Sequence, residues 1–124
     1  MPTFMRFEDI EAWQGARQLV KEVYLLTRTA PCARDRAFCD QLQRAAVSAM
    51  SNIAEGFERD GNREFRRFLA IAKGSVGEVR SLAYVALDLG YLEPSTYERL
   101  TQLAVHTSRR IAKLSAYLEE YNPA

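Results

Sequence analysis

Residues 38–56 read FCDQLQRAAVSAMSNIAEG, and this stretch decides the fold. Its apolar residues recur every three or four positions, which is the period of one face of an α-helix. They are Phe38, Leu42, Ala45, Ala46, Ala49 and Ile53. Gly56 follows them, where helices commonly end with a glycine. The pattern therefore predicts an amphipathic helix over about residues 38–55.

The same spacing predicts a helix before this stretch. Its expected inward face runs from Phe7 to Thr27, and proline disfavours helical geometry in the residue before it, so Pro31 should end the helix. The stem of Arg17 would have to lie along that face. The other members of the face are Phe7, Ile10, Trp13, Val20, Val23, Tyr24 and Thr27.

Two more helices are expected after it, over about residues 62–89 and from Ser95 onward. Gly90 should close the first of them, and Ser95 with Glu98 has the spacing of a capping box for the second. Short loops make sequential helices antiparallel neighbours. The sequence therefore predicts an all-α fold, an antiparallel up-down-up-down four-helix bundle. Its core should include Trp13, Phe65, Phe68, Leu69, Leu103, Ile111 and Leu114.

Length and composition narrow the class of protein. The chain has 124 residues, enough for one domain (1–124), and its formal net charge is +1. A chain so close to neutral would need a local basic patch to bind nucleic acid. No apolar run approaches the ~20 residues that span a bilayer, and residues 1–6 lack a signal-peptide pattern, so we expect a cytoplasmic protein.

A second stripe on the helix over 38–55 is polar. It contains Gln41, Arg44, Ser48, Asn52 and Glu55, spaced by three and four, although a plain solvated face would have the same spacing. The helix over 62–89 also carries two glycines in its interior, Gly74 and Gly77, each costing about 1 kcal/mol relative to alanine.

Close packing of these two helices would offset the cost of the glycines. It would also place Glu78 beside Arg44 as a poorly exposed ion pair. The alternative is a helix break at residues 73–77. We interpret Arg44, Ser48, Asn52, Glu55, Gly74 and Glu78 as structural residues of this contact.

These residues also carry a resemblance. The chain resembles the four-helix-bundle family named for proteins encoded in 23S rRNA intervening sequences. The resembling segments are Gln41 to Ser48, Asn52 to Gly56, Glu64-Phe65, Phe68-Leu69 and Ala72 to Ser75, together with Glu78. The resemblance extends from Phe7 to Leu118. It implies a homopentameric ring of bundles in the bacterial cytoplasm. The related accessory variability proteins of diversity-generating retroelements bind nucleic acid and work with a reverse transcriptase.

The chain departs from the family pattern in two places. Gly61 stands where a serine or threonine usually caps the third helix, and Ala37-Phe38-Cys39 replaces a typical Gly-Leu-Thr. Glycine at a helix start costs only a few tenths of a kcal/mol relative to a hydroxyl residue. The fold expectation is therefore unchanged.

No arrangement of residues predicts catalysis, a cofactor or a metal site. His106 is the only histidine, so neither a di-iron carboxylate site nor a zinc site with Cys32 and Cys39 is complete. We expect the two cysteines to be structural thiols. Ser48 and Ser75 have no evident base, so we predict that the protein is not an enzyme.

The candidate nucleic-acid site is basic. Arg59, Arg63, Arg66 and Arg67 cluster at the turn between the second and third helices, and Arg109, Arg110 and Lys113 should extend toward the same end. Together they could bind phosphate. Glu58, Asp60, Glu64, Glu119 and Glu120 are expected at that end too, so a salt-bridged, solvated surface is the alternative.

Two functions follow as hypotheses. The first is a homo-oligomeric nucleic-acid-binding or ribonucleoprotein accessory module that contacts RNA or DNA. The second is a structural oligomer that binds a protein partner without nucleic acid. Assembly is expected in both, with a pentamer before a dimer, because the chain has apolar residues to spare and several of them fall off the inward stripes. These residues are Phe4, Phe7, Tyr24, Leu25, Leu26, Val47, Met50, Tyr84, Tyr91 and Tyr121.

Overall fold

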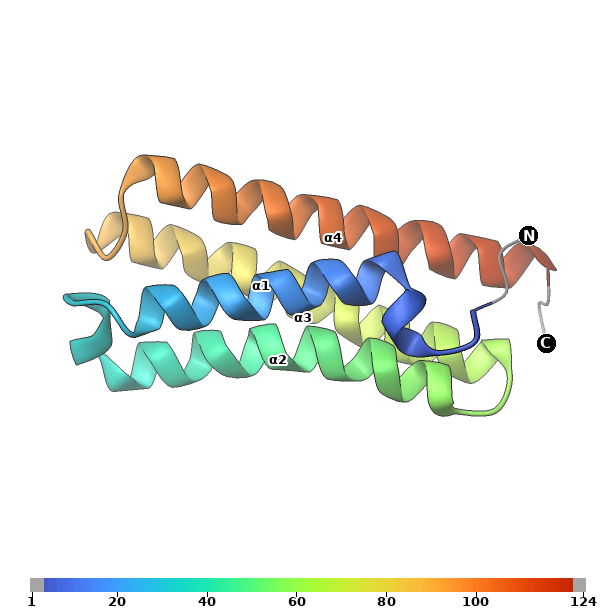
Figure 1. Cartoon of the computed structure of the whole chain (residues 1–124). Helices are drawn as coiled ribbons and strands as arrows, with labels where there is room; N and C mark the ends of the chain where they lie inside the picture. The colour runs from blue at the N-terminus through green and yellow to red at the C-terminus, as the bar shows by residue number, and fades with distance from the viewer. Residues whose placement is uncertain (1–3, 122–124) are drawn as a thin grey trace.

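The computed structural model describes residues 4–121, and Figure 1 shows its four long helices side by side. They are α1 (Glu11–Thr27), α2 (Arg36–Glu58), α3 (Asn62–Asp88) and α4 (Pro94–Tyr121), with short 3-10 turns at Phe7–Asp9 and Cys32–Arg34. Residues 4–121 contain no strand. The predicted all-α four-helix bundle is confirmed. The ends of the predicted domain, residues 1–3 and 122–124, lie outside the described residues.

The helices alternate in direction around the bundle. Figure 1 shows the loops at alternating ends. Across the α2–α3 seam, Gln41 contacts Glu78 and Ser48 contacts Ser75, so residue numbers rise along one helix as they fall along the other. Each of α1 and α3 packs against both α2 and α4. This arrangement puts α1 and α3 at opposite corners.

The core follows the predicted stripes of α2, α3 and α4 closely. Trp13, Phe65, Phe68, Leu69, Ile111 and Leu114 are all buried, as expected. Leu103 is only partly buried, because Ala104 occupies the inward position beside it. Leu89, expected at the inner end of the third stripe, is 56% exposed since it follows the last residue of α3.

The predicted inward face of the first helix is confirmed in part. Ile10, Trp13, Val23 and Thr27 are buried as expected, and Val20 is partly buried. Ala12, Ala16 and Leu19 are buried as well, although they were not expected to be. Arg17 is exposed, and its guanidinium lies 5.8 Å from the centre of the Trp13 ring. Two of the buried positions that the prediction missed are alanines, Ala12 and Ala16, which let α1 approach the core closely but give a weak apolar signal.

Gly56 does not end a helix as predicted, because α2 continues to Glu58. It is buried, and a Cβ atom placed on it would lie 2.6 Å from the Cβ atom of Phe68 and 3.0 Å from Cδ1 of Phe65. Real Cβ atoms essentially never approach a neighbour within 3.0 Å. Gly56 therefore allows α2 and α3 to approach closely.

The ends of α3 both use glycine in the left-handed region. Gly61, with φ +85°, precedes the first residue of α3, which accounts for glycine where the family resemblance leads one to expect a hydroxyl residue. Gly90, with φ +73°, follows the helix as predicted. The Tyr91 backbone N–H donates to Ala86 O at 2.8 Å and the Gly90 N–H to Leu87 O at 3.1 Å. These bonds form a Schellman motif.

The start of α4 differs from the predicted capping box. The helix begins at Pro94, so Ser95 lies inside its first turn rather than before it. Proline is favoured at the first helical position because its fixed φ suits the helix. An N–H group at that position would have no acceptor within the helix, so proline loses no hydrogen bond there. The helix therefore starts at Pro94 and not after Ser95.

Candidate nucleic-acid interface

A row of polar side chains joins α2 to α3. The hydroxyls of Ser48 and Ser75 are 2.9 Å apart, and the Asn52 side chain donates to the Ser48 carbonyl oxygen at 2.8 Å and its hydroxyl at 3.0 Å. Further along, Gln41 donates to Glu78 at 3.4 Å. These bonds fix the register of the two helices, and all four inter-helix partners come from the segments that carry the family resemblance.

The predicted Arg44–Glu78 ion pair is wrong. Both residues are exposed, and no ion pair joins them, whereas Glu78 accepts from Gln41. Arg44 lines two shallow grooves, one with Tyr24 between α1 and α2 and one with Glu78 between α2 and α3, without forming an ion pair in either. An exposed guanidinium keeps its water, so it does not need a buried partner.

The two glycines of α3 do not pack against α2 as predicted. Gly74 and Gly77 are exposed, and a Cβ atom on either would meet no atom within 4 Å. The helix also runs through them without a break, which removes the alternative interpretation. Among the described residues, neither glycine makes a close contact that would offset its helical cost.

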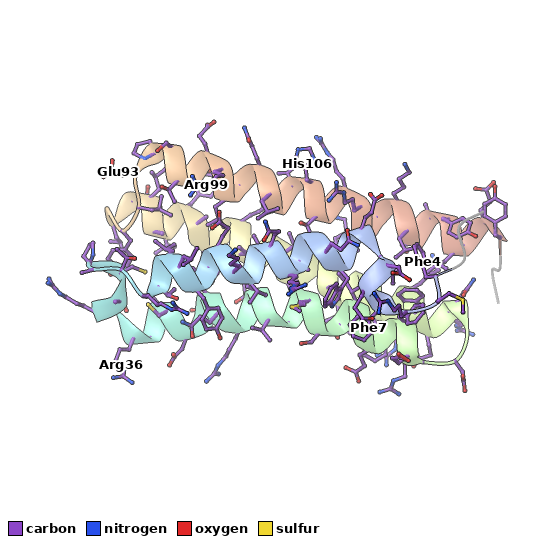
Figure 2. All side chains as sticks on the ribbon, viewed as in Figure 1. Phe4, Phe7, Arg36, Glu93, Arg99 and His106 are labelled. Atoms are coloured by element: carbon purple, nitrogen blue, oxygen red, sulfur yellow. The ribbon has the colours of Figure 1, made fainter. Side chains whose placement is uncertain are left out.

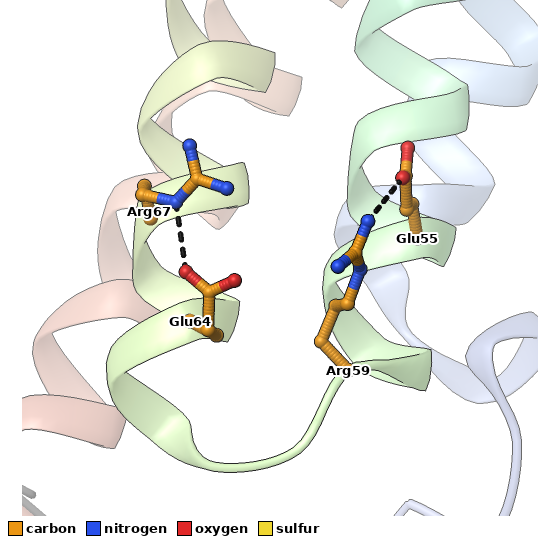
Figure 3. A network of polar contacts seen from close by, with 4 residues as sticks. All are labelled: Glu55, Arg59, Glu64 and Arg67. Carbon is orange, nitrogen blue, oxygen red and sulfur yellow. Dashed lines mark hydrogen bonds and ion pairs between the residues drawn. The ribbon is translucent and has the colours of Figure 1, made fainter.

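The arginines at the α2–α3 turn are largely neutralised by carboxylates. Arg59 donates to Glu55 at 3.0 Å and Arg67 to Glu64 at 2.8 Å, and Figure 3 shows these two pairs facing each other across the turn. The hydrogen bond from Arg67 is the main reason that the pKa of Glu64 lies below its usual value. Half-exposed pairs of this kind contribute little to stability.

The other predicted cations divide between paired and unpaired. Arg66 donates to Glu119 of α4 at 2.9 Å, and Arg110 lies 3.6 Å from Glu11 of α1. Within residues 4–121, no ion pair involves Arg63, Arg109 or Lys113, and all three are exposed. The structure therefore separates the seven predicted residues into four compensated and three uncompensated charges.

Two further unpaired cations on α3 lie outside the predicted set. Lys73 and Arg80 on α3 are exposed and take part in no ion pair with any described residue. They lie two helical turns apart, and the sequence around them contains few acids. That spacing is present in the sequence, but it is much less conspicuous than the dense arginine cluster at the turn.

No reactive centre is evident in the part of the chain that the structure describes. It contains no group of three or more His, Cys, Asp or Glu side chains that could hold a metal ion. His106 is exposed on the outer edge of α4, away from the other labelled polar residues (Figure 2). The Cys32 and Cys39 sulfur atoms lie 3.8 Å apart in the core, where burial raises the pKa of Cys32 to about 12.

Comparison with known proteins identifies the family. The family model described as 23S rRNA-intervening sequence protein matches residues 8–113, which is most of the chain. The chain belongs to this family. The match includes the polar α2–α3 seam and both glycines of α3. A search of curated proteins finds no match.

The 23S rRNA-intervening sequence protein match contains all seven predicted cations and ends at the last of them, Lys113. It covers α1, α2 and α3 completely and about two-thirds of α4. Among the described residues, none of the helices is both long enough and apolar enough to cross a membrane.

Proposed function

We propose that this member of the family is a non-enzymatic, homo-oligomeric RNA-binding protein, a ribonucleoprotein accessory module built from one bundle domain and acting in the bacterial cytoplasm. The observation that carries this proposal is the set of exposed, uncompensated cations, Arg63, Arg109 and Lys113, on a member of a family named for an rRNA insertion. Such cations attract phosphate without reading sequence.

The alternative function also has an observation in its favour. Arg59, Arg66, Arg67 and Arg110 are each held by a carboxylate, so the densest part of the predicted patch is electrically compensated. A structural oligomer that binds a protein partner needs no net positive face. Binding of RNA decides between the two functions.

Purified protein should bind RNA, with an affinity that falls steeply as salt is raised from about 0.05 to 0.2 M, because each phosphate contact releases counterions. Fluorescence anisotropy with labelled single-stranded and duplex RNA of the same sequence measures this. Binding that is absent at the lowest salt, or that does not respond to salt, would favour the protein-partner function.

Two separate exposed surfaces support the oligomeric part of the proposal. Tyr24, Leu25 and Val47 are 36%, 48% and 38% exposed on the α1–α2 side. Ile71 and Val85 are 43% and 40% exposed on α3, with the open Gly74 between them. A ring of subunits needs two different faces that meet, so this arrangement favours the pentamer over a two-fold dimer.

Light scattering should give a particle of about 70 kDa, five times the 14.1 kDa chain. Gly74→Arg should reduce the particle mass while leaving the bundle folded, because the site is open within one chain and arginine is a better helix former than glycine. Gln18→Arg on exposed α1 is the matched control and should remain assembled. A monomeric wild-type protein would refute the assembly.

A further inference from the structure

One stripe of α3 faces α4 along most of the bundle. Arg66, Lys73 and Arg80 are seven residues apart, so they lie above one another at every second turn. Arg66 donates to Glu119 of α4, which places the stripe beside that helix. One turn beyond Arg80, the Tyr84 ring lies 5.4 Å from the ring of Tyr97, also on α4.

The neighbouring helix α4 carries no acidic residue over its whole middle part. There is no acidic residue between Glu98 and Glu119, while Arg109 and Lys113 are exposed one turn apart on the solvent side of the helix. On α3 the only acid between Glu64 and Asp88 is Glu78. Its carboxylate accepts a hydrogen bond from Gln41, so it lies on the opposite, α2 side of α3.

This surface differs from the α2–α3 turn in its charge balance. At the turn, Arg59 and Arg67 are each held by a glutamate on their own helix. On the α3–α4 surface, neither of the two α3 cations, Lys73 and Arg80, is in an ion pair with a described residue, and the same is true of the two on α4. Charges without partners are the ones that can neutralise phosphate and release its counterions.

The aromatic pair at one end indicates the form of the ligand. Tyr84 is 56% exposed beside the stripe of cations, and Tyr97 lies against it. A positive groove combined with an accessible aromatic ring is the usual arrangement for single strands, whose bases stack on the ring. Duplex RNA keeps its bases stacked on one another and would not use Tyr84.

We propose that the α3–α4 face, defined by Lys73, Arg80, Arg109 and Lys113 with Tyr84 at its end, binds single-stranded RNA. This proposal rests on the RNA-binding function above, and it names the surface and the form of RNA. The backbone would follow the four cations, and a base would stack on Tyr84.

The test uses the assembled protein and a labelled oligouridylate of about 20 nucleotides, longer than a typical single-strand site. Lys73→Gln/Arg80→Gln and Arg109→Gln/Lys113→Gln should each weaken binding about tenfold at about 0.1 M salt. The salt slope is the slope of the logarithm of the binding constant against the logarithm of the salt concentration. Each variant should reduce the magnitude of this slope by about 0.7 for every phosphate that it no longer neutralises. Arg59→Gln/Arg67→Gln removes the same charge from the turn and should change both the affinity and the slope little.

Tyr84 is tested separately from charge. Tyr84→Ala should weaken binding about fivefold or more without changing the salt slope, and Tyr84→Phe should retain the affinity because its ring still stacks. Light scattering and circular dichroism on every variant confirm that assembly and helix content are unchanged.

The outcomes separate this proposal from the function beneath it. If the wild-type protein binds no RNA, both the RNA-binding function and the assignment of the α3–α4 face are wrong. Wild-type binding that is weakened by the turn variant and unaffected by the α3–α4 variants keeps the function and overturns this face. Tighter binding of duplex than of single strands, an unaffected Tyr84→Ala, or tighter binding of the matching DNA oligonucleotide overturns the single-stranded RNA assignment.

Discussion

Replacing Phe68 by alanine should lower the free energy of unfolding by about 3–5 kcal/mol, the usual cost of truncating a buried aromatic residue. Phe68 is only 6% exposed although it lies near the N-terminal end of α3. The guanidiniums of Arg59 and Arg67 lie 5.0 and 4.9 Å from its ring centre, and Gly56 contacts it from α2. Truncation would leave a cavity beneath the two arginines.

Chemical denaturation followed by circular dichroism measures this decrease, at one fixed protein concentration because assembly would make stability concentration-dependent. Tyr84→Ala is the control on the same helix. Its ring is 56% exposed and keeps only its contact with Tyr97, so the decrease should be about 1 kcal/mol, well below that of Phe68→Ala. A decrease below about 1 kcal/mol for Phe68→Ala would mean that the ring contributes little to the core.

The helices could be predicted from the sequence because their apolar residues have a strong period. The stripe from Phe38 to Ile53 is buried at every expected position. The first helix was predicted only in part. Trp13 and Val23 are buried as expected, but Ala16 and Leu19 are buried too and Arg17 is exposed. Packing against the other helices decides which of these positions face inward.

Glycines were the least predictable part of the seam. All the helical glycines look alike in the sequence, since each one only lowers helix propensity. The structure distinguishes Gly56, which lies against Phe68, from Gly74 and Gly77, which meet nothing. That difference depends on the rotation of α2 and α3 about their axes, and a short-range pattern does not contain it.

The candidate site was predictable in composition but not in charge balance. The basic cluster is visible in the sequence, and the local pairs of Arg59 and Arg67 follow from helical spacing. The Arg66–Glu119 pair joins residues 53 positions apart, so it depends on the register of α3 and α4. The α3–α4 face of unpaired cations can be identified only after such distant pairs have been assigned.

Gly56→Val should destabilise the protein by about 3 kcal/mol, because three carbon atoms would enter a contact that the first of them already overfills. The Cβ atom alone would lie 2.6 Å from that of Phe68 and 3.3 Å from the Phe65 backbone oxygen, and the latter cannot rotate away. α2 and α3 would have to separate, which would weaken the hydrogen bonds between the two helices, including the one between Ser48 and Ser75.

Gly74→Ala is the matched control for this close approach, and thermal or urea unfolding of both variants tests it. Its new Cβ atom meets nothing within one chain, so the isolated bundle should gain about 1 kcal/mol from helix propensity. A loss of stability at Gly56 together with a gain at Gly74 would show that Gly56 serves the contact with the neighbouring helix and not backbone flexibility. Equal effects would contradict this, because propensity alone raises stability at both sites.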